Sequence, residues 1–259
     1  MSRLINLRCK LINKVKNADN MFELFESGET VILGISGGKD SLCMADLMFF
    51  YNEKTRKNLK FYGVYVDNGM QLLNEKEKED IKAFLDKRNI VFNTINDEET
   101  LKSIKNKTKP FNPCFICTRG RRKKLVEIAQ KIGVKKIALA HNLDDLVETL
   151  LLNILFAREI SSFLPKQELF SGEFHIVRPL VLIESGLILK YAREAMLPFV
   201  VNRCVYKDKN RRERIRGFIK ELERDVPYIK KNILRAMMNC KKEFLWDKYR
   251  EYKKEILDL

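Results

Sequence analysis

A short run of glycine, serine and lysine has the composition of a phosphate-binding loop. It stands between a β-rich apolar run and an apolar-periodic helix and consists of Ser36, Gly37, Gly38, Lys39, Asp40 and Ser41. Glycines let the backbone approach a phosphate, and the helix N-terminus that follows supplies unpaired N–H donors. The spacing matches neither a Walker A loop nor the Gly-x-Gly-x-x-Gly of dinucleotide-binding folds. It predicts a phosphate site of another class, and a capped glycine turn is the structural alternative.

Two cysteines three positions apart form a second candidate site. Cys114 and Cys117 lie in Pro-Cys-Phe-Ile-Cys, followed by a basic stretch that includes Arg121. Two thiolates at this spacing can face one metal. Taken alone, the pair is compatible with half a zinc site, part of an iron–sulfur site, a redox pair or core filling.

A third motif combines a histidine with two carboxylates at a predicted helix start. It reads His141-Asn142-Leu143-Asp144-Asp145. Carboxylate oxygens suit Mg²⁺, which prefers hard oxygen ligands. Capping of the helix and compensation of its dipole are the structural alternative for the two aspartates.

Positive charge is concentrated around the cysteine pair. The chain has 259 residues and a formal charge of +15, and residues 101–136 carry twelve Lys or Arg against one acidic residue, Glu127. A basic surface attracts polyanions. Residues 201–259 add eighteen bases against ten acids on amphipathic helical patterns. We interpret this concentration of charge as a contact for an acidic partner, and solvated lysine-rich faces are the structural alternative.

Strand and helix patterns alternate through the middle of the chain and predict an α/β fold with a parallel sheet. The expected strands are 30–35, 61–66, 90–95, 136–140 and 174–177. The expected helices are 3–19, one that follows residues 36–41 and runs to about 52, 74–88, one that begins just after the cysteine pair and runs to about 132, 143–156 and 184–194. Two or three more are expected from 208 to the end. A polar segment covers 98–112. Ile215, Phe218, Ile219 and Leu222 are spaced as the core face of a helix.

The glycine loop and the histidine–aspartate motif each follow a predicted strand. In a parallel sheet the carboxyl ends of the strands share one edge, which is where ligands bind in open α/β folds. We therefore expect the two motifs to lie close together.

The order of the three motifs resembles the TtcA/TtuA group of tRNA thiolases, most closely the tRNA 2-thiocytidine synthetase family. The resemblance covers roughly residues 5–240. It implies a PP-loop ATP pyrophosphatase domain, a Rossmann-like fold of the adenine nucleotide alpha hydrolase type, with helical extensions at both ends. We expect an N-terminal basic helix over 1–25, the catalytic domain over 26–200 and a basic helical region over 201–259.

The resemblance also implies the functional residues. Cys114, Cys117 and Cys204 would hold a [4Fe-4S] cluster with one open iron, and residues 36–41 with His141 would bind Mg·ATP. Catalytic, metal or substrate roles fall on Lys39, Asp40, Asp145 and Arg121. Cys43 is interpreted as a core residue, Cys9 and Cys240 have no partner at ligand spacing, and His175 is interpreted as structural.

The implied reaction is ATP-dependent thiolation of a tRNA pyrimidine. The base is adenylated at its C2 oxygen, and sulfur from sulfide or a cysteine desulfurase replaces the oxygen. The extra Cys-x-x-Cys zinc modules of the 2-thiouridine branch are missing here, which favours cytidine. The rivals are an enzyme like tRNA-lysidine synthetase, which needs no cysteine trio, and a non-catalytic, zinc-holding tRNA-binding module.

The location expected from the sequence is the cytoplasm. No run of about 18 uncharged apolar residues occurs, and the N-terminus lacks the apolar core of a signal peptide. We therefore expect no membrane partner, and the chain could pair as a homodimer.

Overall fold

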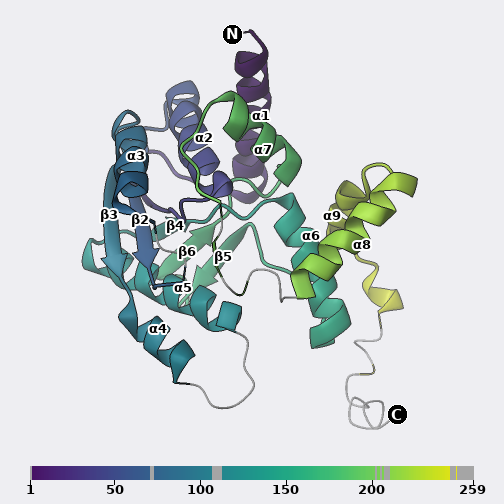
Figure 1. Cartoon of the computed structure of the whole chain (residues 1–259). Coiled ribbons are helices and arrows are strands. Elements are labelled where there is room, and N and C mark those ends of the chain that lie inside the picture. Colours follow the sequence, from purple (N-terminus) through teal and green to yellow (C-terminus); the bar gives the residue numbers. More distant parts are fainter. Residues whose placement is uncertain are drawn as a thin grey trace. The chain divides into compact units, whose positions relative to one another are not determined.

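A six-stranded sheet forms the centre of the described structure. The computed structural model describes residues 2–70, 73–106, 113–201, 203–204, 206, 211–245 and 249. The strand order is β3-β2-β1-β4-β6-β5 (Figure 1). The strands are β1 (Thr30–Gly34), β2 (Lys60–Asp67), β3 (Val91–Asn96), β4 (Lys136–Ala138), β5 (Lys166–Leu169) and β6 (Phe174–Val177). The order places β1 beside β4, so the chain runs outward to both sides from the middle of the sheet.

The sheet is parallel except at one edge. β1 pairs in parallel with β2 and β4, β2 with β3, and β4 with β6. These pairings confirm the predicted α/β class. β5 pairs antiparallel with β6, and no strand was predicted there, because Lys166–Leu169 reads Lys-Gln-Glu-Leu and lacks an apolar run. An edge strand needs fewer buried side chains than a central parallel one.

Helices follow most of the strands. They are α1 (Ser2–Phe22), α2 (Lys39–Thr55), α3 (Glu75–Asp86), α4 (Glu98–Lys105), α5 (Pro113–Lys131), α6 (Leu143–Leu152), η1 (Asn153–Ala157), α7 (Ser185–Glu194), α8 (Arg211–Asp225), α9 (Ile229–Met238) and η3 (Lys242–Phe244). The predicted helix 143–156 is α6 continued by one π-helical turn, η1.

Helix α4 lies inside the segment predicted only as polar, 98–112. Asp97 caps its N-terminus by accepting from Thr100 N at 3.3 Å, and glutamates begin it while lysines end it, as the helix dipole favours. α4 packs on α5. A Cβ on Gly120 would meet Thr100 Oγ1 at 1.9 Å, so the close approach of the two helices requires glycine there.

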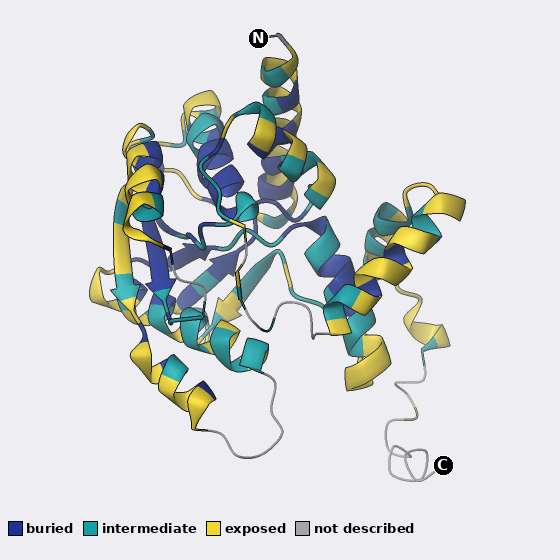
Figure 2. Ribbon diagram, viewed as in Figure 1, coloured by how far each residue is buried: buried dark blue, intermediate teal, exposed yellow. Residues whose placement is uncertain are grey.

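The core lies on both faces of the sheet. Ile32 of β1 and Ile137 of β4 share a buried cluster with Leu125 and Ala129 of α5. On the other side, α1, α2 and α7 pack together (Figures 1 and 2). α2 is buried along most of its length, which agrees with its central position.

The chain divides into two compact units, residues 1–215 and 216–259. The three-segment division expected from the sequence stays a prediction. Within α8, Ile215 and Ile219 are buried as predicted, but Phe218 is half exposed, so the core prediction was wrong at that position. Helical spacing identifies a face, and a residue at the margin of that face can remain in solvent.

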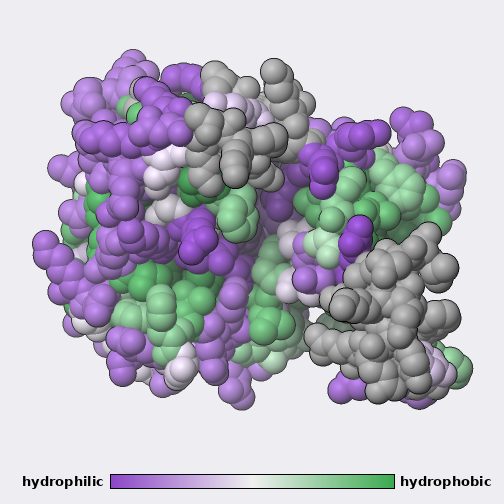
Figure 3. All heavy atoms as spheres, turned by 90° about the horizontal axis from the view of Figure 1, so that it is seen from below, coloured by the Kyte–Doolittle hydropathy of each residue, from purple (hydrophilic) through white to green (hydrophobic). Residues whose placement is uncertain are grey.

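Hydrophilic residues cover much of the face drawn in Figure 3, and hydrophobic patches interrupt them. Within the described residues, no helix is long and apolar enough to cross a membrane.

A buried carboxylate joins several helices. Asp46 of α2 has no exposed surface and accepts from Arg88 Nε at 2.6 Å and from the hydroxyl of Tyr191 in α7. Arg8 of α1 donates to the same tyrosine at 2.8 Å. A buried charge is tolerated when it is paired and hydrogen-bonded in this way.

We predict that Asp46→Ala lowers the free energy of unfolding by about 3–5 kcal/mol, because it leaves the Arg88 guanidinium and the Tyr191 hydroxyl without their buried partner. Urea unfolding followed by circular dichroism measures the change. Lys102→Ala is the control: it breaks the exposed Lys102–Glu98 pair and should cost less than about 1 kcal/mol. Equal effects of the two substitutions would contradict the structural role of Asp46.

Candidate functional site

The glycine loop lies where β1 ends and α2 begins. Gly37 adopts φ +77°, a conformation that favours glycine. Ser36 and Ser41 close the loop, because Ser36 N donates to Ser41 Oγ at 3.1 Å and the two hydroxyl oxygens lie 3.1 Å apart. The loop is therefore pre-shaped around the first turn of α2.

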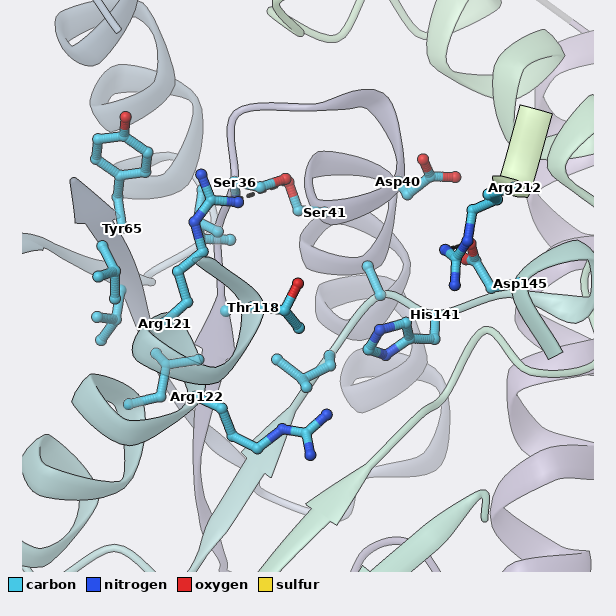
Figure 4. Close-up of a pocket in the computed structure, with 17 residues that line it drawn as sticks. Ser36, Asp40, Ser41, Tyr65, Thr118, Arg121, Arg122, His141, Asp145 and Arg212 are labelled. Carbon is cyan, nitrogen blue, oxygen red and sulfur yellow. Dashed lines mark hydrogen bonds and ion pairs between the residues drawn. The ribbon is translucent and has the colours of Figure 1, made fainter. Parts of the chain in front are cut away.

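The loop opens onto a cavity of about 450 Å³, which we call the loop cavity (Figure 4). The side chains and backbone that line it come from β1, α2, β2, α5, α6 and α8 and from the segments that follow β1 and β4. They are Gly34, Ile35, Ser36, Asp40, Ser41, Val64, Tyr65, Val66, Thr118, Arg121, Arg122, Leu125, Leu139, Ala140, His141, Asp145 and Arg212. The wall is apolar at the strands and charged at the helices, as suits a ligand with a flat ring and anionic groups.

The loop residues divide between lining the cavity and shaping it. Ser36, Asp40 and Ser41 line the cavity, whereas Gly37, Gly38 and Lys39 do not. Lys39 Nζ donates to Asp40 Oδ1 at 2.7 Å and to Ser185 Oγ at 2.9 Å. The ammonium group thus stands beside the cavity, next to a carboxylate that lines it.

The histidine–aspartate motif meets the glycine loop directly. Asn142 Nδ2 donates to Asp40 Oδ1 at 3.1 Å. Asn142 and Asp145 also form the reciprocal capping box of α6. The two motifs thus lie close together, as expected from the sequence. Asn142 caps α6 and also links this motif to the glycine loop.

The two aspartates have different positions. Asp145 lines the loop cavity, whereas Asp144 accepts from Ser185 N at 2.7 Å, at the start of α7. Burial is the main cause that raises the pKa of Asp145 to about 6, and the bond from the Asn142 backbone and the charge of Arg212 oppose it. Asp145 can therefore change its charge near neutral pH, and it lines the cavity while it also caps α6.

An arginine of α8 closes onto Asp145. Arg212 Nη1 lies 3.4 Å from Asp145 Oδ1, and its Nε lies 3.6 Å from Glu148 Oε2 (Figure 4). Nothing local to residue 212 in the sequence signals this contact, because the two residues are far apart along the chain.

Three cysteines from distant segments line a second cavity of about 200 Å³, which we call the cysteine cavity. Cys114 and Cys117 belong to the first turns of α5, and Cys204 comes from the segment after α7. The other lining residues are Met70, Pro113, Thr118, Arg121 and Tyr206. The structure thus brings together the three cysteines predicted from the family resemblance.

Two residues of α5 line both cavities. Thr118 and Arg121 belong to the loop cavity and to the cysteine cavity alike. Asn68, a buried residue just after β2, donates to Cys117 Sγ at 3.0 Å and accepts from Arg121 Nη2 at 3.5 Å. The two cavities therefore share a wall that carries a positive charge.

The cysteine trio supplies a set of donors that fits a [4Fe-4S] cluster. Among the described residues, no group of three His, Cys, Asp or Glu could hold one metal ion. A [4Fe-4S] cluster places its thiolate ligands on different irons and so does not need them to converge on one point. Three thiol donors around one cavity satisfy that requirement.

The remaining cysteines lie elsewhere. Cys43 is fully buried in α2, where burial is the first cause that raises the pKa of its thiol, and this confirms its interpretation as a core residue. Cys9 and Cys240 are exposed. His175 lies in β6 and lines neither cavity.

Several residues of the site were missed by sequence reasoning. They are Tyr65, Asn68, Thr118, Arg122, Arg178 and Arg212. Asn68 had a usable signal, since it follows the predicted strand 61–66 at the ligand-binding edge. Tyr65 lies in that predicted strand, and Thr118 and Arg122 follow the cysteine pair in the basic stretch of the second motif, although none of the three was assigned a role. Arg178 and Arg212 have no motif of their own.

Comparison with known proteins agrees with this geometry. A family model described as a PP-loop domain matches residues 9–223. The tRNA-cytidine(32) 2-sulfurtransferase of Geobacter sulfurreducens is 32% identical, with 95% of this chain and 96% of that protein covered. The enzyme of the same name from Methylobacillus flagellatus is 31% identical, with 94% and 80% covered.

A solved structure shares the fold. The U34-tRNA thiolase NcsA from Methanococcus maripaludis, solved with its [4Fe-4S] cluster, superposes with a TM-score of 0.75 at 22% identity. The alignment covers 90% of this chain and 78% of that one. With a PP-loop model over most of its length and full-length relatives above 30% identity, the chain belongs to the PP-loop family and, within it, to the tRNA sulfurtransferases.

Proposed function

We propose that the protein uses ATP to replace the C2 oxygen of a tRNA cytidine by sulfur. The observation that carries the proposal is the shared wall of the two cavities, in which Thr118 and Arg121 face both the phosphate-loop side and the three cysteines. Activation by ATP and delivery of sulfur must act on one carbon atom, so their sites have to adjoin.

The loop cavity suits ATP. The strand side chains Val64 and Val66 offer an apolar wall for adenine, and the hydroxyls of Ser36 and Ser41 stand at the start of α2. Unpaired N–H groups at that helix N-terminus attract phosphate. Lys39, beside the cavity, adds a positive charge, and Asp40 and Asp145 offer oxygen ligands for Mg²⁺.

The first step makes oxygen a leaving group. The C2 oxygen of the base attacks the α-phosphorus of ATP, forming a base–AMP bond and releasing pyrophosphate. Lys39 and the loop amides neutralise charge that develops on the phosphates. Arg121 lines both cavities, so it lies where the base is activated on one side and receives sulfur on the other.

Cys114, Cys117 and Cys204 hold the [4Fe-4S] cluster in this proposal. Such a cluster would supply an iron centre that can hold sulfur for transfer to the base. Sulfur then attacks C2 and AMP leaves, so the C–O bond breaks as the C–S bond forms. Sulfide supplies the sulfur directly, whereas persulfide sulfur from a cysteine desulfurase also requires two electrons from a thiol reductant.

The tRNA requires a basic surface. The excess of lysine and arginine over residues 101–136 lies largely in α4 and α5, beside the cysteine cavity. Cytidine as the target, a homodimer and a cytoplasmic location remain predictions.

We predict that anaerobic reconstitution yields about four irons and four acid-labile sulfides per chain. Cys114→Ala, Cys117→Ala and Cys204→Ala should each lose the cluster, whereas Cys9→Ala and Cys240→Ala, at exposed cysteines, should retain it. Iron and sulfide analysis with absorption spectra measures this. If the protein holds only zinc, or if Cys204→Ala binds as much iron as the parent, the result would favour a zinc-holding tRNA binder or a lysidine-synthetase-like enzyme.

Lys39→Ala should reduce tRNA-dependent formation of AMP from ATP by about 10²–10³-fold, because a charge next to the reacting phosphates is lost. Thin-layer chromatography of labelled ATP measures it. Lys54→Ala, at the far end of the same helix and paired with Asn13, is the matched control and should behave as the parent. A fully active Lys39→Ala protein would contradict the proposed role of the glycine loop in binding the phosphates of ATP.

A pH dependence follows from Asp145. Both a magnesium ligand and a group that orients a nucleophile act as the carboxylate, which exists above the pKa of about 6. kcat/KM, which reports the free enzyme, should therefore fall about tenfold per pH unit below pH 6. Asp145→Asn should lose this acid limb together with most activity, while Asp144→Asn, outside the cavity, should keep the limb. An unchanged limb in Asp145→Asn would assign it to another group.

A further inference from the structure

A fully buried arginine stands behind the loop cavity. Arg178 follows β6 and is only 1% exposed. Its Nη1 donates to Leu164 O at 2.5 Å and its Nη2 to Gln167 Oε1 at 3.1 Å. The guanidinium carbon lies 4.6 Å from the centre of the Phe163 ring. These contacts fix the guanidinium plane, so the direction of its Nε–H is fixed as well.

The Nε–H of Arg178 points at a histidine that lines the loop cavity. Arg178 Nε lies 3.3 Å from His141 Nδ1, and the imidazole also packs on Phe163 with the ring centres 5.1 Å apart. A guanidinium can only donate hydrogen bonds. Nδ1 must therefore be the acceptor, and in a neutral imidazole the proton is then on Nε2.

The surroundings keep the imidazole neutral. Burial is the largest cause that lowers the pKa of His141 to about 3, and the charges of Arg178, Arg212 and Arg122 lower it further. Arg178 itself stays protonated at neutral pH, because burial lowers its pKa only to about 10. Three arginines from different elements thus surround the ring, and a second positive charge on it is disfavoured.

His141 lines the loop cavity (Figure 4), and within the described part of the chain its Nε2 makes no hydrogen bond. We propose that Arg178 is a positioning residue that holds His141 as the Nε2–H tautomer, so that His141 donates a hydrogen bond to an acceptor atom of the nucleotide. This inference rests on the proposed binding of ATP in the loop cavity. The role of Arg178 itself does not depend on which nucleotide binds.

The arrangement selects among ligands. The Nε2–H of a neutral His141, held by the buried Arg178 cation, favours a ligand with an oxygen or nitrogen acceptor at this position. A ligand that places a donor there would leave that donor without a hydrogen-bond partner, which is costly in a buried site. The protonated form of His141 is not needed at any step. His141 should therefore act in binding the nucleotide and not as an acid or base.

The tautomer can be measured in the intact protein without ATP. The chain has only two histidines, so ¹⁵N-histidine labelling gives two imidazole spin systems, and His175→Gln identifies the one that belongs to His141. We expect Nδ1 to be unprotonated and Nε2 protonated, unchanged between about pH 8 and pH 5. A protonated Nδ1, or a ring that titrates near its ordinary pKa of about 6.5, would overturn the proposal.

Substitution of Arg178 tests the positioning. Arg178→Lys keeps a positive charge but loses the planar set of donors, so we expect a mixture of His141 tautomers and an ATP affinity about tenfold lower. Unchanged spectra of His141 in a folded Arg178→Lys protein would contradict the proposal. The measurement on the parent protein stands even if this variant does not fold.

Two substitutions of His141 test the donor. A glutamine amide reaches the position of Nε2, whereas an asparagine amide reaches only that of Nδ1. We expect His141→Gln to keep ATP affinity within about threefold and His141→Asn to lose about tenfold, measured by calorimetry with a non-hydrolysable ATP analogue. Equal affinities would overturn the donor role.

The outcomes separate this inference from the proposed function. If the parent protein binds no ATP analogue but shows the expected tautomer, the proposed function and the donor role fail while the positioning by Arg178 holds. If ATP binds but His141 has the other tautomer, the positioning fails and the proposed function holds.

Discussion

The parallel pairing of β1 with β4 in the middle of the sheet determines where the site can form. Val31 pairs with Lys136 and Leu33 with Ala138, so both strands end at the same edge. The chain then leaves β1 toward β2 and leaves β4 toward β6. Because these connections diverge, they open a crevice at that edge, as in other doubly wound sheets. The glycine loop and the histidine–aspartate motif are the first residues past the two strand ends, and both face the crevice.

Single polar residues connect the two sides of the crevice. Asn142 caps α6, closes a capping box with Asp145 and donates to Asp40 of the glycine loop. Lys39 reaches in the opposite direction, to Ser185 at the start of α7. Each contact satisfies a group that would otherwise be left unpaired in a partly buried position. The same contacts therefore stabilise the fold and hold the loop in shape for a ligand.

The geometry of one helix relates the two cavities. Cys114, Cys117, Thr118 and Arg121 are spaced by three and four positions in α5, so they share one face of the helix. The N-terminal part of that face lines the cysteine cavity, and Thr118 and Arg121 line both. Asn68 links Cys117 to Arg121 from the end of β2. The positive charge of Arg121 is therefore available to a ligand in either cavity.

The sequence by itself determined the α/β class, five parallel strand positions and the three motifs, because each depends on residues that are close together in the chain. Periodicity identifies buried strands and helix faces, and the glycine loop carries its chemistry within six residues. It did not reveal β5, whose residues are polar, or helix α4, whose apolar face is short. It also assigned both Asp144 and Asp145 to one role, which the structure separates.

Only the tertiary structure brought Arg178 to His141, Arg212 to Asp145 and Asn68 to Cys117. Cys204 was expected beside Cys114 and Cys117 only through the family resemblance, and their common cavity needed the fold. Such contacts join residues that are dozens of positions apart, and nothing in the local pattern of either partner specifies the other. They arise when helices and loops pack around the sheet and each buried charge or hydrogen-bonding group has to find a partner.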